Sequence, residues 1–517
     1  MNGFIILIMA FSTMVRMVAI TKPLLGNFSS YQTVWAMMAR FMEQEGFRDL
    51  LNVKVNVLVN GQPGLHLLSY PLASLVAAIL HTLGGGSLDF WGRFQAILFS
   101  VSSIPFFYHL VRRLGGDSVA KVSTFVYAFS PLNVIYGQSF MNEACALFFL
   151  LSGLYTLVAA LAKEKTMLFI LSGGLMGIAI FSRLHMGHLY LPIGYLFWKR
   201  FGIRFPFNRK FIFYFLPSLI LPLAWYGYAH WASLRYDHIY YDLSMQQNFV
   251  KRGLTENLLS PVFYQNLFDN VGQLIFTPVG LGFFILGLFS SKNFPERRLL
   301  GFWLASVFVY FIPLSDKVMH ENFFTLPLVP VGAIYAGIGF EAATKGVAKA
   351  AGLRPVFACL FLLFSLRAFF NPLRAVPEED KNLLPVALEV QQIVPPEAIL
   401  VAARGSAPDL LYYSNRNGWP FYLAQKQDFR PQYVIGKWNQ INPDRRLLMD
   451  EAKGDAGKWL EFLRKEGADY FVASNAEEFL REKAFADYVE GRYLKVATKT
   501  PFVLFDLNKT AEGASVS

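Results

Sequence analysis

Long runs of apolar residues dominate the first 371 positions of this chain and predict membrane-spanning helices. Eleven runs approach the roughly 17–25 residues that a helix needs to cross the hydrocarbon core. They fall at residues 3–20, 91–111, 118–136, 144–161, 167–181, 189–198 with its flanks, 211–231, 274–289, 299–314, 323–340 and 356–370. We therefore expect an α-helical polytopic membrane protein with about 11 transmembrane helices.

A twelfth apolar segment, residues 65–83, is interrupted by Pro71 and by two histidines. Basic loops occur at residues 112–113, 163–165, 199–210, 292–298 and 345–349. Short cytoplasmic loops carry an excess of Lys and Arg, so these loops are expected on the cytoplasmic side. Their alternation with the other connections holds only if the twelfth segment does not cross. We predict that it is an interfacial or re-entrant helix, in a large external loop at residues 21–90 that also contains a helix at 31–46.

The pattern changes after residue 371, where the apolar runs shorten to the length of β-strands. Strands are expected at residues 399–403, 470–473, 493–497 and 502–505, with helices at 383–393, 457–466 and 476–485. The pattern predicts two domains, a transmembrane domain at residues 1–371 and a small soluble α/β domain at 372–517. The last crossing places this second domain outside the cytoplasm, on the same side as the first loop.

Composition supports a bilayer environment. Only 16% of the 517 residues are charged, against roughly 25% in soluble domains, and the chain contains 51 Phe. The net charge of +11 resides mainly in short loops, so it indicates orientation in the membrane and does not predict nucleic-acid binding. Both cysteines lie in apolar runs, which gives no sign of a disulfide framework or a thiolate metal site.

A small set of polar residues stands at the predicted outer ends of the spans, where charge at membrane depth is costly and often functional. They are Arg93, Glu143, Arg183, His185, His188, Lys317 and His320. Cations at this face suit a phosphate or pyrophosphate group. Structural roles fit as well: Glu143 can cap a helix, and Arg93 can extend its charge to lipid head groups. His185 and His188 have the spacing of metal ligands, but no third ligand is close in sequence.

Several segments together resemble a known family. They are "YQTVWAMMARFMEQEGF", "LLSYPLASLVAAILHTLGG", "WGRFQAILFS", "AFSPLNVIYGQSFMNEACALFF", "HENFFTLPLVP" and "LLYYSNRNGW". In order and spacing they resemble polytopic membrane glycosyltransferases of the C superfamily. The resemblance is to the branch of protein O-mannosyltransferases and aminoarabinose transferases, which is similar to glycosyltransferase family 39.

The resemblance implies transfer of a sugar from a polyprenyl-phosphate-linked donor to a lipid, glycan or protein acceptor on the extracytoplasmic face. It implies an inverting displacement, in which an acidic residue of the first loop is the base and Arg and Lys stabilise the departing phosphate. Glu143 matches the family's second acidic residue, and Arg93 matches an arginine that opens a span. His320 and the pair Phe323-Phe324 match the family's His/Asn–Tyr–Tyr segment before the Leu-Pro run. The residues expected to contact substrate are Arg93, Arg183, His185, Lys317 and His320.

One position departs from the family pattern. Alignment on Arg40 places Tyr31 and Gln32 where family members with the acidic motif have an Asp-Glu pair. Tyr31 and Gln32 are therefore taken, with Glu143, as the catalytic positions. No carboxylate stands where the base is expected.

Two other classes of protein stay open. A transporter or flippase would show inverted repeats, and a catalytically inactive relative would act as a binding partner. The sequence requires no cofactor and leaves a divalent cation open. The expected location is multi-pass in the membrane, in a bacterial plasma membrane, with the C-terminal domain extracytoplasmic.

Overall fold

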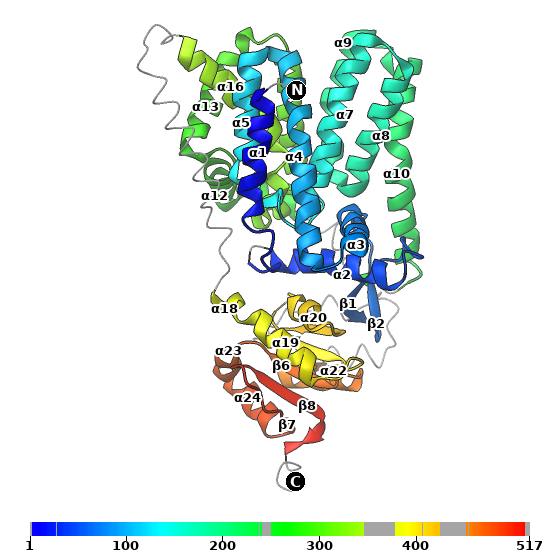
Figure 1. Ribbon diagram of the computed structural model, residues 1–517, viewed down its shortest axis with the longest axis vertical. Helices are drawn as coiled ribbons and strands as arrows, with labels where there is room; N and C mark the ends of the chain where they lie inside the picture. The colour runs from blue at the N-terminus through cyan, green and yellow to red at the C-terminus, as the bar shows by residue number, and fades with distance from the viewer. Residues whose placement is uncertain are drawn as a thin grey trace.

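The computed structural model describes residues 3–26, 28–236, 238–239, 250–345, 378–405, 407–423, 451–452 and 454–511. A bundle of helices, a layer formed by the first loop and an α/β unit follow one another along the long axis of the molecule (Figure 1). The predicted span at residues 356–370 lies outside the described residues.

Helices of the bundle follow most of the predicted spans. They are α1 (Gly3–Met17), α4 (Leu88–Gly115), α5 (Asp117–Phe129), α7 (Glu143–Lys163), α8 (Thr166–Ser182), α9 (Tyr190–Phe201), α10 (Arg209–Ser233), α13 (Thr277–Ser290), α14 (Arg297–Phe311) and α16 (Leu328–Lys345). Helix α12 (Pro261–Asp269) precedes α13 and lies outside the predicted spans. Among the described residues, α4, α7 and α10 are each long and apolar enough to span a membrane alone. A fourth candidate is a pair, Pro261–Ile275 with Thr277–Ser290, that is bent by 105°. The number of eleven crossings stays a prediction.

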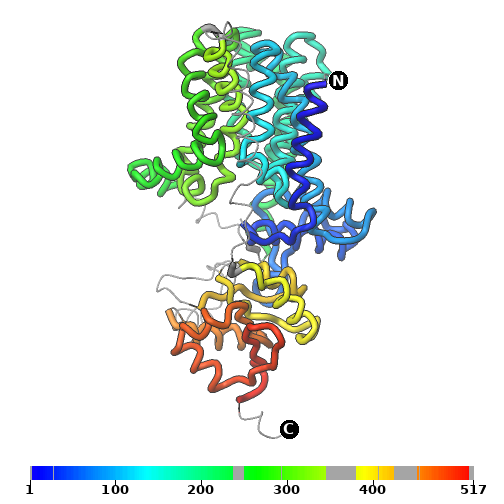
Figure 2. The backbone as a smooth tube through the Cα atoms, turned by 60° about the vertical axis from the view of Figure 1, so that its left-hand side comes forward, coloured from blue at the N-terminus to red at the C-terminus, as the bar shows by residue number. Residues whose placement is uncertain are grey.

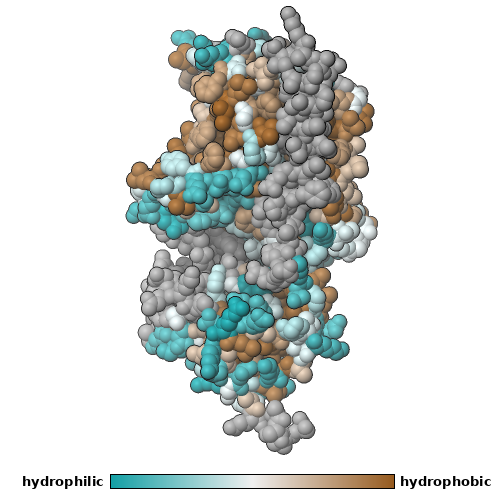
Figure 3. All heavy atoms as spheres, turned by 90° about the vertical axis from the view of Figure 1, so that its left-hand side faces the viewer, coloured by the Kyte–Doolittle hydropathy of each residue, from teal (hydrophilic) through white to brown (hydrophobic). Residues whose placement is uncertain are grey.

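The surface of the bundle has the polarity of a membrane protein. On the face drawn in Figure 3, hydrophobic side chains gather on the helical part, between hydrophilic groups at its two ends. At the end away from the α/β unit, Lys199 binds Glu296 at 2.7 Å, and Arg200 and Lys210 both bind Glu164. These basic residues belong to the loops that the sequence assigns to the cytoplasm.

A buried arginine holds part of the bundle together. Arg16 of α1 is fully buried and donates to the Ser100 hydroxyl at 3.1 Å and to the carbonyls of Ala128 and Asn133 at 3.0 and 3.2 Å. A charge at this depth is stable only when its donors are satisfied. Arg16 therefore ties α1 to α4 and to the break after α5.

That break divides the predicted span at residues 118–136. Helix α5 ends at Phe129, and a short helix, α6 (Pro131–Tyr136), begins after Ser130. A residue that precedes proline is excluded from helical geometry by its clash with the ring, and Ser130 has an extended ψ of 123°. The chain then forms an irregular loop before α7.

The first loop lies across one end of the bundle, as two views show (Figures 1 and 2). It contains α2 (Ser29–Gln44), the hairpin β1 (Lys54–Val59) and β2 (Gln62–His66), and α3 (Leu72–Gly84). Helix α3 has 13 residues. At about 1.5 Å per residue it extends roughly 20 Å, which is less than the ~30 Å of a hydrocarbon core. Helices α5 and α9, at predicted crossings, have 13 and 12 residues, so length does not decide whether α3 crosses, and its interfacial placement stays a prediction.

The first loop and the C-terminal segment share one sheet. Its eight strands run in the order β3-β2-β1-β5-β4-β6-β8-β7. The strands not yet placed are β3 (His238–Ile239), β4 (Leu400–Ala403), β5 (Gly418–Phe421), β6 (Tyr470–Ala473), β7 (Tyr493–Lys495) and β8 (Val503–Thr510). The C-terminal helices are α18 (Glu378–Lys381), α19 (Leu383–Ile393), α20 (Asp409–Ser414), α22 (Ala456–Lys465), α23 (Ala476–Arg481) and α24 (Lys483–Glu490).

The junction of the sheet is the pairing of β1 with β5, at Val57 opposite Gly418. Gly418 also lies opposite Leu400 of β4, where a Cβ would come within 1.9 Å of the Leu400 carbonyl oxygen. Trp419 fixes the register further, since its indole N–H donates to the Leu58 carbonyl at 3.1 Å. The C-terminal segment is therefore anchored on the first loop by backbone and side chains together.

Candidate active site

Glu143 begins α7 at the end of the bundle that faces the first loop (Figure 1). The preceding residue, Asn142, fixes this end. Its side-chain oxygen accepts from the Ala73 N–H at 2.9 Å, and its amide donates to the carbonyls of Tyr70 and Ser182 at 2.8 Å. The side-chain amide of Asn142 thus connects the start of α7 to the start of α3 and to the end of α8. These backbone contacts fix the position of the next residue, Glu143.

Glu143 forms an ion pair with Arg183, the residue that follows α8. Both side chains are buried, with 2% of Glu143 and 11% of Arg183 exposed. Beyond this pair, neither carboxylate oxygen of Glu143 has a hydrogen-bond partner among the described residues. A buried charge pair is retained against a large desolvation penalty, and its unused oxygens can accept hydrogen bonds from a bound molecule.

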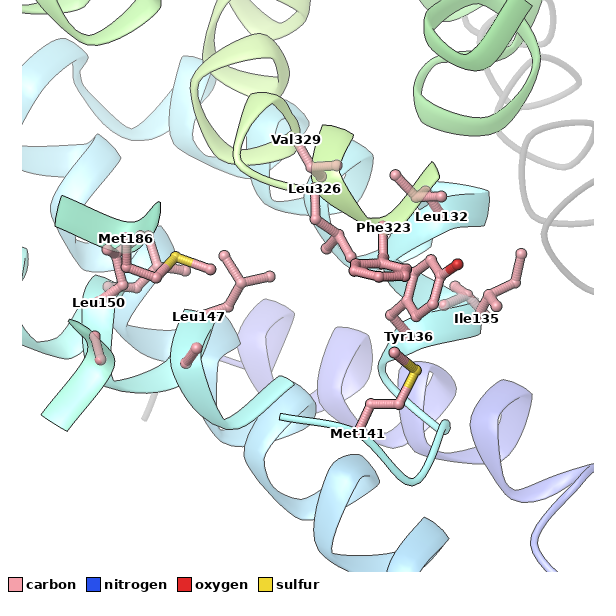
Figure 4. Packing of buried hydrophobic residues seen from close by; sticks show 14 of the residues in the cluster. Leu132, Ile135, Tyr136, Met141, Leu147, Leu150, Met186, Phe323, Leu326 and Val329 are labelled. Atoms are coloured by element: carbon pink, nitrogen blue, oxygen red, sulfur yellow. The ribbon is translucent and has the colours of Figure 1, made fainter. Parts of the chain in front are cut away.

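An aromatic wall covers Arg183. The guanidinium carbon lies 5.4 Å from the ring centre of Trp35 and 5.5 Å from that of Phe323, distances at which cation–π attraction operates. Phe323 lies beside Tyr136, and the Met141 side chain points toward Tyr136 in the close view of Figure 4. The wall therefore joins α2, α6 and the segment before α16 around one cation.

Tyr31 and Gln32, the predicted catalytic positions on α2, make different contacts. The Tyr31 ring lies 5.5 Å from that of Phe323, edge to face. Gln32 is buried, and its side-chain oxygen accepts from the Phe140 N–H at 3.1 Å. Gln32 thus supports the loop before Glu143, and its catalytic role stays a prediction.

His185 and His188 lie in the turn after Arg183, at Leu184–Leu189, and both stack on Tyr310 of α14. His188 also shares a hydrogen bond of 2.9 Å with the Ser306 hydroxyl. The described residues contain no group of three or more His, Cys, Asp or Glu side chains that could hold a metal ion.

Lys317 and His320, both in α15 (Ser315–His320), have different environments. Lys317 binds the carboxylate of Glu321 at 2.7 Å, whereas His320 is exposed. Glu321, which the sequence did not single out, is near enough to act electrostatically on Glu143. The two ion pairs Glu143–Arg183 and Lys317–Glu321 thus belong to one site.

Arg93 is buried at the start of α4 and donates to backbone carbonyls of two segments. It binds those of Lys22 and Pro23 at 3.1 and 2.8 Å and that of Gln138 at 3.2 Å. It therefore connects the start of the first loop with the loop before Glu143. The predicted contact of Arg93 with substrate stays a prediction.

Further residues of the site were not visible in the sequence because their side chains come from different elements. His66 ends β2, lies 5.9 Å from the Trp35 ring and is fully buried. Burial and the nearby charge of Arg183 lower the pKa of His66 from 6.5 to about 4, so it is neutral at pH 7. Trp35 and Tyr310 read as ordinary apolar positions in their helical patterns.

A cavity of about 400 Å³ lies at the junction of α3 and α4, apart from this cluster. Its lining consists of Thr21, Gly84, Gly85, Gly86, Ser87, Phe90 and Trp91. The chemistry of the charged cluster does not extend into it.

Comparisons with known proteins agree with the motif resemblance. The family model for dolichyl-phosphate-mannose-protein mannosyltransferases matches residues 67–226, which include Arg93, Glu143 and Arg183. No curated protein matches the chain. The resemblance to C-superfamily glycosyltransferases is confirmed by this match together with the solved structures.

Three solved structures have this fold. The crystal structure of ArnT from Cupriavidus metallidurans bound to undecaprenyl phosphate has a TM-score of 0.60 and 15% identity, and the alignment covers 98% of each chain. The Archaeoglobus fulgidus oligosaccharyltransferase with Zn and sulfate has a TM-score of 0.61 and 12% identity, over 97% of this chain and 72% of that one. The arabinofuranosyltransferase AftD from Mycobacteria has a TM-score of 0.60 and 13% identity, over 99% and 40%. The chain therefore has the fold of these integral membrane glycosyltransferases.

Proposed function

We propose that this chain, with the fold of the membrane glycosyltransferases, transfers a sugar from a polyprenyl-phosphate carrier to a hydroxyl group of a lipid, glycan or protein acceptor. The observation that carries the proposal is the buried pair Glu143–Arg183 under the aromatic wall. The family match and the fold of ArnT and the oligosaccharyltransferase support glycosyl transfer as the reaction class. The solved ArnT structure contains undecaprenyl phosphate, which supports a lipid-linked donor.

In this proposal Arg183 binds the phosphate of the donor. Its guanidinium is bound to Glu143 on one side, and its Nε has no hydrogen-bond partner among the described residues. As the bond between sugar and phosphate breaks, negative charge develops on the phosphate, and a cation fixed in a dry site stabilises that charge. Glu143 keeps the guanidinium oriented, and the rings of Trp35 and Phe323 exclude water.

The location follows from the same arrangement. The site, the first loop and the C-terminal segment all lie at the end of the bundle opposite the basic loops (Figure 1). With the basic loops in the cytoplasm, this end is extracytoplasmic. We place the chain in a bacterial plasma membrane with transfer at its outer face.

The substitution Glu143→Gln tests the function. It should abolish transfer of radiolabelled sugar from polyprenyl-phosphate donors to an envelope extract, while the variant still elutes as a folded protein in detergent. Glu477→Gln is the matched control, because that side chain is 86% exposed in the C-terminal unit. Full activity of Glu143→Gln would overturn the proposed site. A wild-type protein that transfers no sugar from donors carrying different hexoses and pentoses would overturn the function and favour an inactive relative.

A further inference from the structure

Glu321 occupies a break between two helical turns. Helix α15 ends at His320, and a 3-10 turn begins at Asn322, so that Glu321 itself has extended dihedrals of −128° and 94°. Asn322 accepts a hydrogen bond from the Tyr136 hydroxyl, and Phe323 lies against Arg183. The two residues that follow Glu321, Asn322 and Phe323, therefore both contact the site, and they fix the backbone that carries Glu321.

The two carboxylates of the site differ in access. The side chain of Glu143 is 2% exposed and that of Glu321 is 13% exposed, while its partner Lys317 is 24% exposed. A base must lie within hydrogen-bond reach of the hydroxyl from which it takes a proton. Glu321 and Lys317 are therefore more accessible to a molecule from water than Glu143 is.

The charged residues of the site form two separate ion pairs, and each pair contains one of the two carboxylates. Arg183 is bound by Glu143, and Lys317 is bound by Glu321, so the cluster has two cations and two carboxylates in separate pairs. Phe323, two residues after Glu321, lies 5.5 Å from the guanidinium carbon of Arg183, so both ion pairs adjoin the aromatic wall. Gln32, at the position where relatives with the acidic motif have a carboxylate, is bonded to the Phe140 N–H and cannot take up a proton.

We propose that Glu321 is the general base that activates the acceptor hydroxyl, and that Lys317 holds its carboxylate ionised and oriented. The inference rests on the proposed glycosyl transfer and names the residue that completes it. Glu321 thereby replaces the carboxylate that the first loop lacks.

The step balances as an inverting displacement. The Glu321 carboxylate takes the hydroxyl proton of the acceptor, and the acceptor oxygen forms a bond to the anomeric carbon of the sugar. The bond from that carbon to the phosphate oxygen breaks, and its electron pair leaves with the polyprenyl phosphate. Arg183 stabilises the phosphate that departs, and the proton on Glu321 passes to water.

The experiment compares Glu321→Gln and Glu321→Ala with wild type in two assays. Transfer of radiolabelled sugar from the polyprenyl-phosphate donor that wild type uses should fall by roughly 10²–10⁴-fold, the typical share of general base catalysis. Binding of polyprenyl phosphate alone should stay unchanged, because the base does not contact the donor phosphate. Glu341→Gln is the control. Glu341 lies near the C-terminal end of α16, away from Glu321, and this variant should keep wild-type transfer.

Chemical rescue separates a base from a structural residue. Sodium formate supplies a small carboxylate, and it should restore transfer by Glu321→Ala in a concentration-dependent way without affecting Glu321→Gln. Lost activity without rescue, or lost binding of polyprenyl phosphate, would assign Glu321 a structural role and overturn the inference. Retained activity of Glu321→Gln would overturn it too, while leaving the proposed function intact. Failure of the wild type to transfer sugar would instead remove the proposed function itself.

Discussion

Asp89, in the first turn of α4, accepts a hydrogen bond of 2.6 Å from the hydroxyl of Tyr412, a residue 323 positions later in α20. Tyr413 donates to the other oxygen of the same carboxylate at 2.8 Å. Arg40 of α2 lies 4.3 Å over the Tyr412 ring and donates to its backbone carbonyl at 2.9 Å. The "LLYYSNRNGW" segment is thus the place where the C-terminal unit is docked on the helices next to the site.

This docking predicts that Asp89→Ala destabilises the junction. Two tyrosine hydroxyls would lose their acceptor in a partly buried place, at up to roughly 1–3 kcal/mol for each unsatisfied group. We expect a lower unfolding temperature in detergent and faster proteolysis between the helices and the C-terminal unit. Asp487→Asn, an exposed residue of α24 in that unit, is the control and should leave both unchanged. Equal protease resistance of Asp89→Ala and wild type would contradict the docking.

The pair Glu143–Arg183 predicts strong coupling in a double-mutant cycle. Arg183→Met alone leaves a carboxylate buried without its cation, which destabilises proteins by roughly 3–5 kcal/mol. The double variant Glu143→Gln/Arg183→Met removes both charges and should be more stable than Arg183→Met. Thermal unfolding of all four proteins in one detergent measures the coupling. Additive effects would show that the two charges do not interact in the folded protein.

His66 predicts that stability falls in acid. Its pKa is about 4 in the folded protein against 6.5 for a free histidine. The unfolded chain therefore binds the proton first, so stability is complete above pH 6.5 and decreases as the pH falls towards 4. At about 1.4 kcal/mol per pKa unit the loss approaches roughly 3 kcal/mol. The difference in unfolding temperature between pH 7.5 and pH 5 should be smaller for His66→Gln than for wild type, and an equal difference would remove His66 as its cause.

The contacts of Arg93 predict that its substitution lowers the stability of the protein but does not change its affinity for the donor lipid. Its three hydrogen bonds to carbonyls connect the start of the first loop to the loop before Glu143. Arg93→Met should lower the unfolding free energy by roughly 1–3 kcal/mol, because buried carbonyls lose their donors. Its affinity for polyprenyl phosphate, measured on the folded fraction, should equal that of wild type. A selective loss of that affinity would instead support the substrate contact expected from the family resemblance.

The apolar runs alone were enough to locate most helices of the bundle, because hydrophobic length is a local property of the chain. Expected strands at residues 399–403 and 470–473 also coincide with β4 and β6. The outer ends of the predicted spans brought Glu143 and Arg183 into one candidate site, and the structure shows the ion pair between them. Local periodicity and motif order were sufficient for each of these.

Only the tertiary structure decided which residues from distant segments meet. The pairing of β1 with β5 and the bond between Trp419 and Leu58 join positions 361 residues apart, and no local pattern encodes such a contact. Glu321 read as an ordinary polar residue after His320, and the break between α15 and the following turn is what directs it to the site. The sequence determined that most charges collect at the two ends of an apolar bundle, since burial in lipid disfavours them in between. Packing determined which of those charges pair, because a buried charge is stable only where an opposite charge or hydrogen-bonding groups satisfy it.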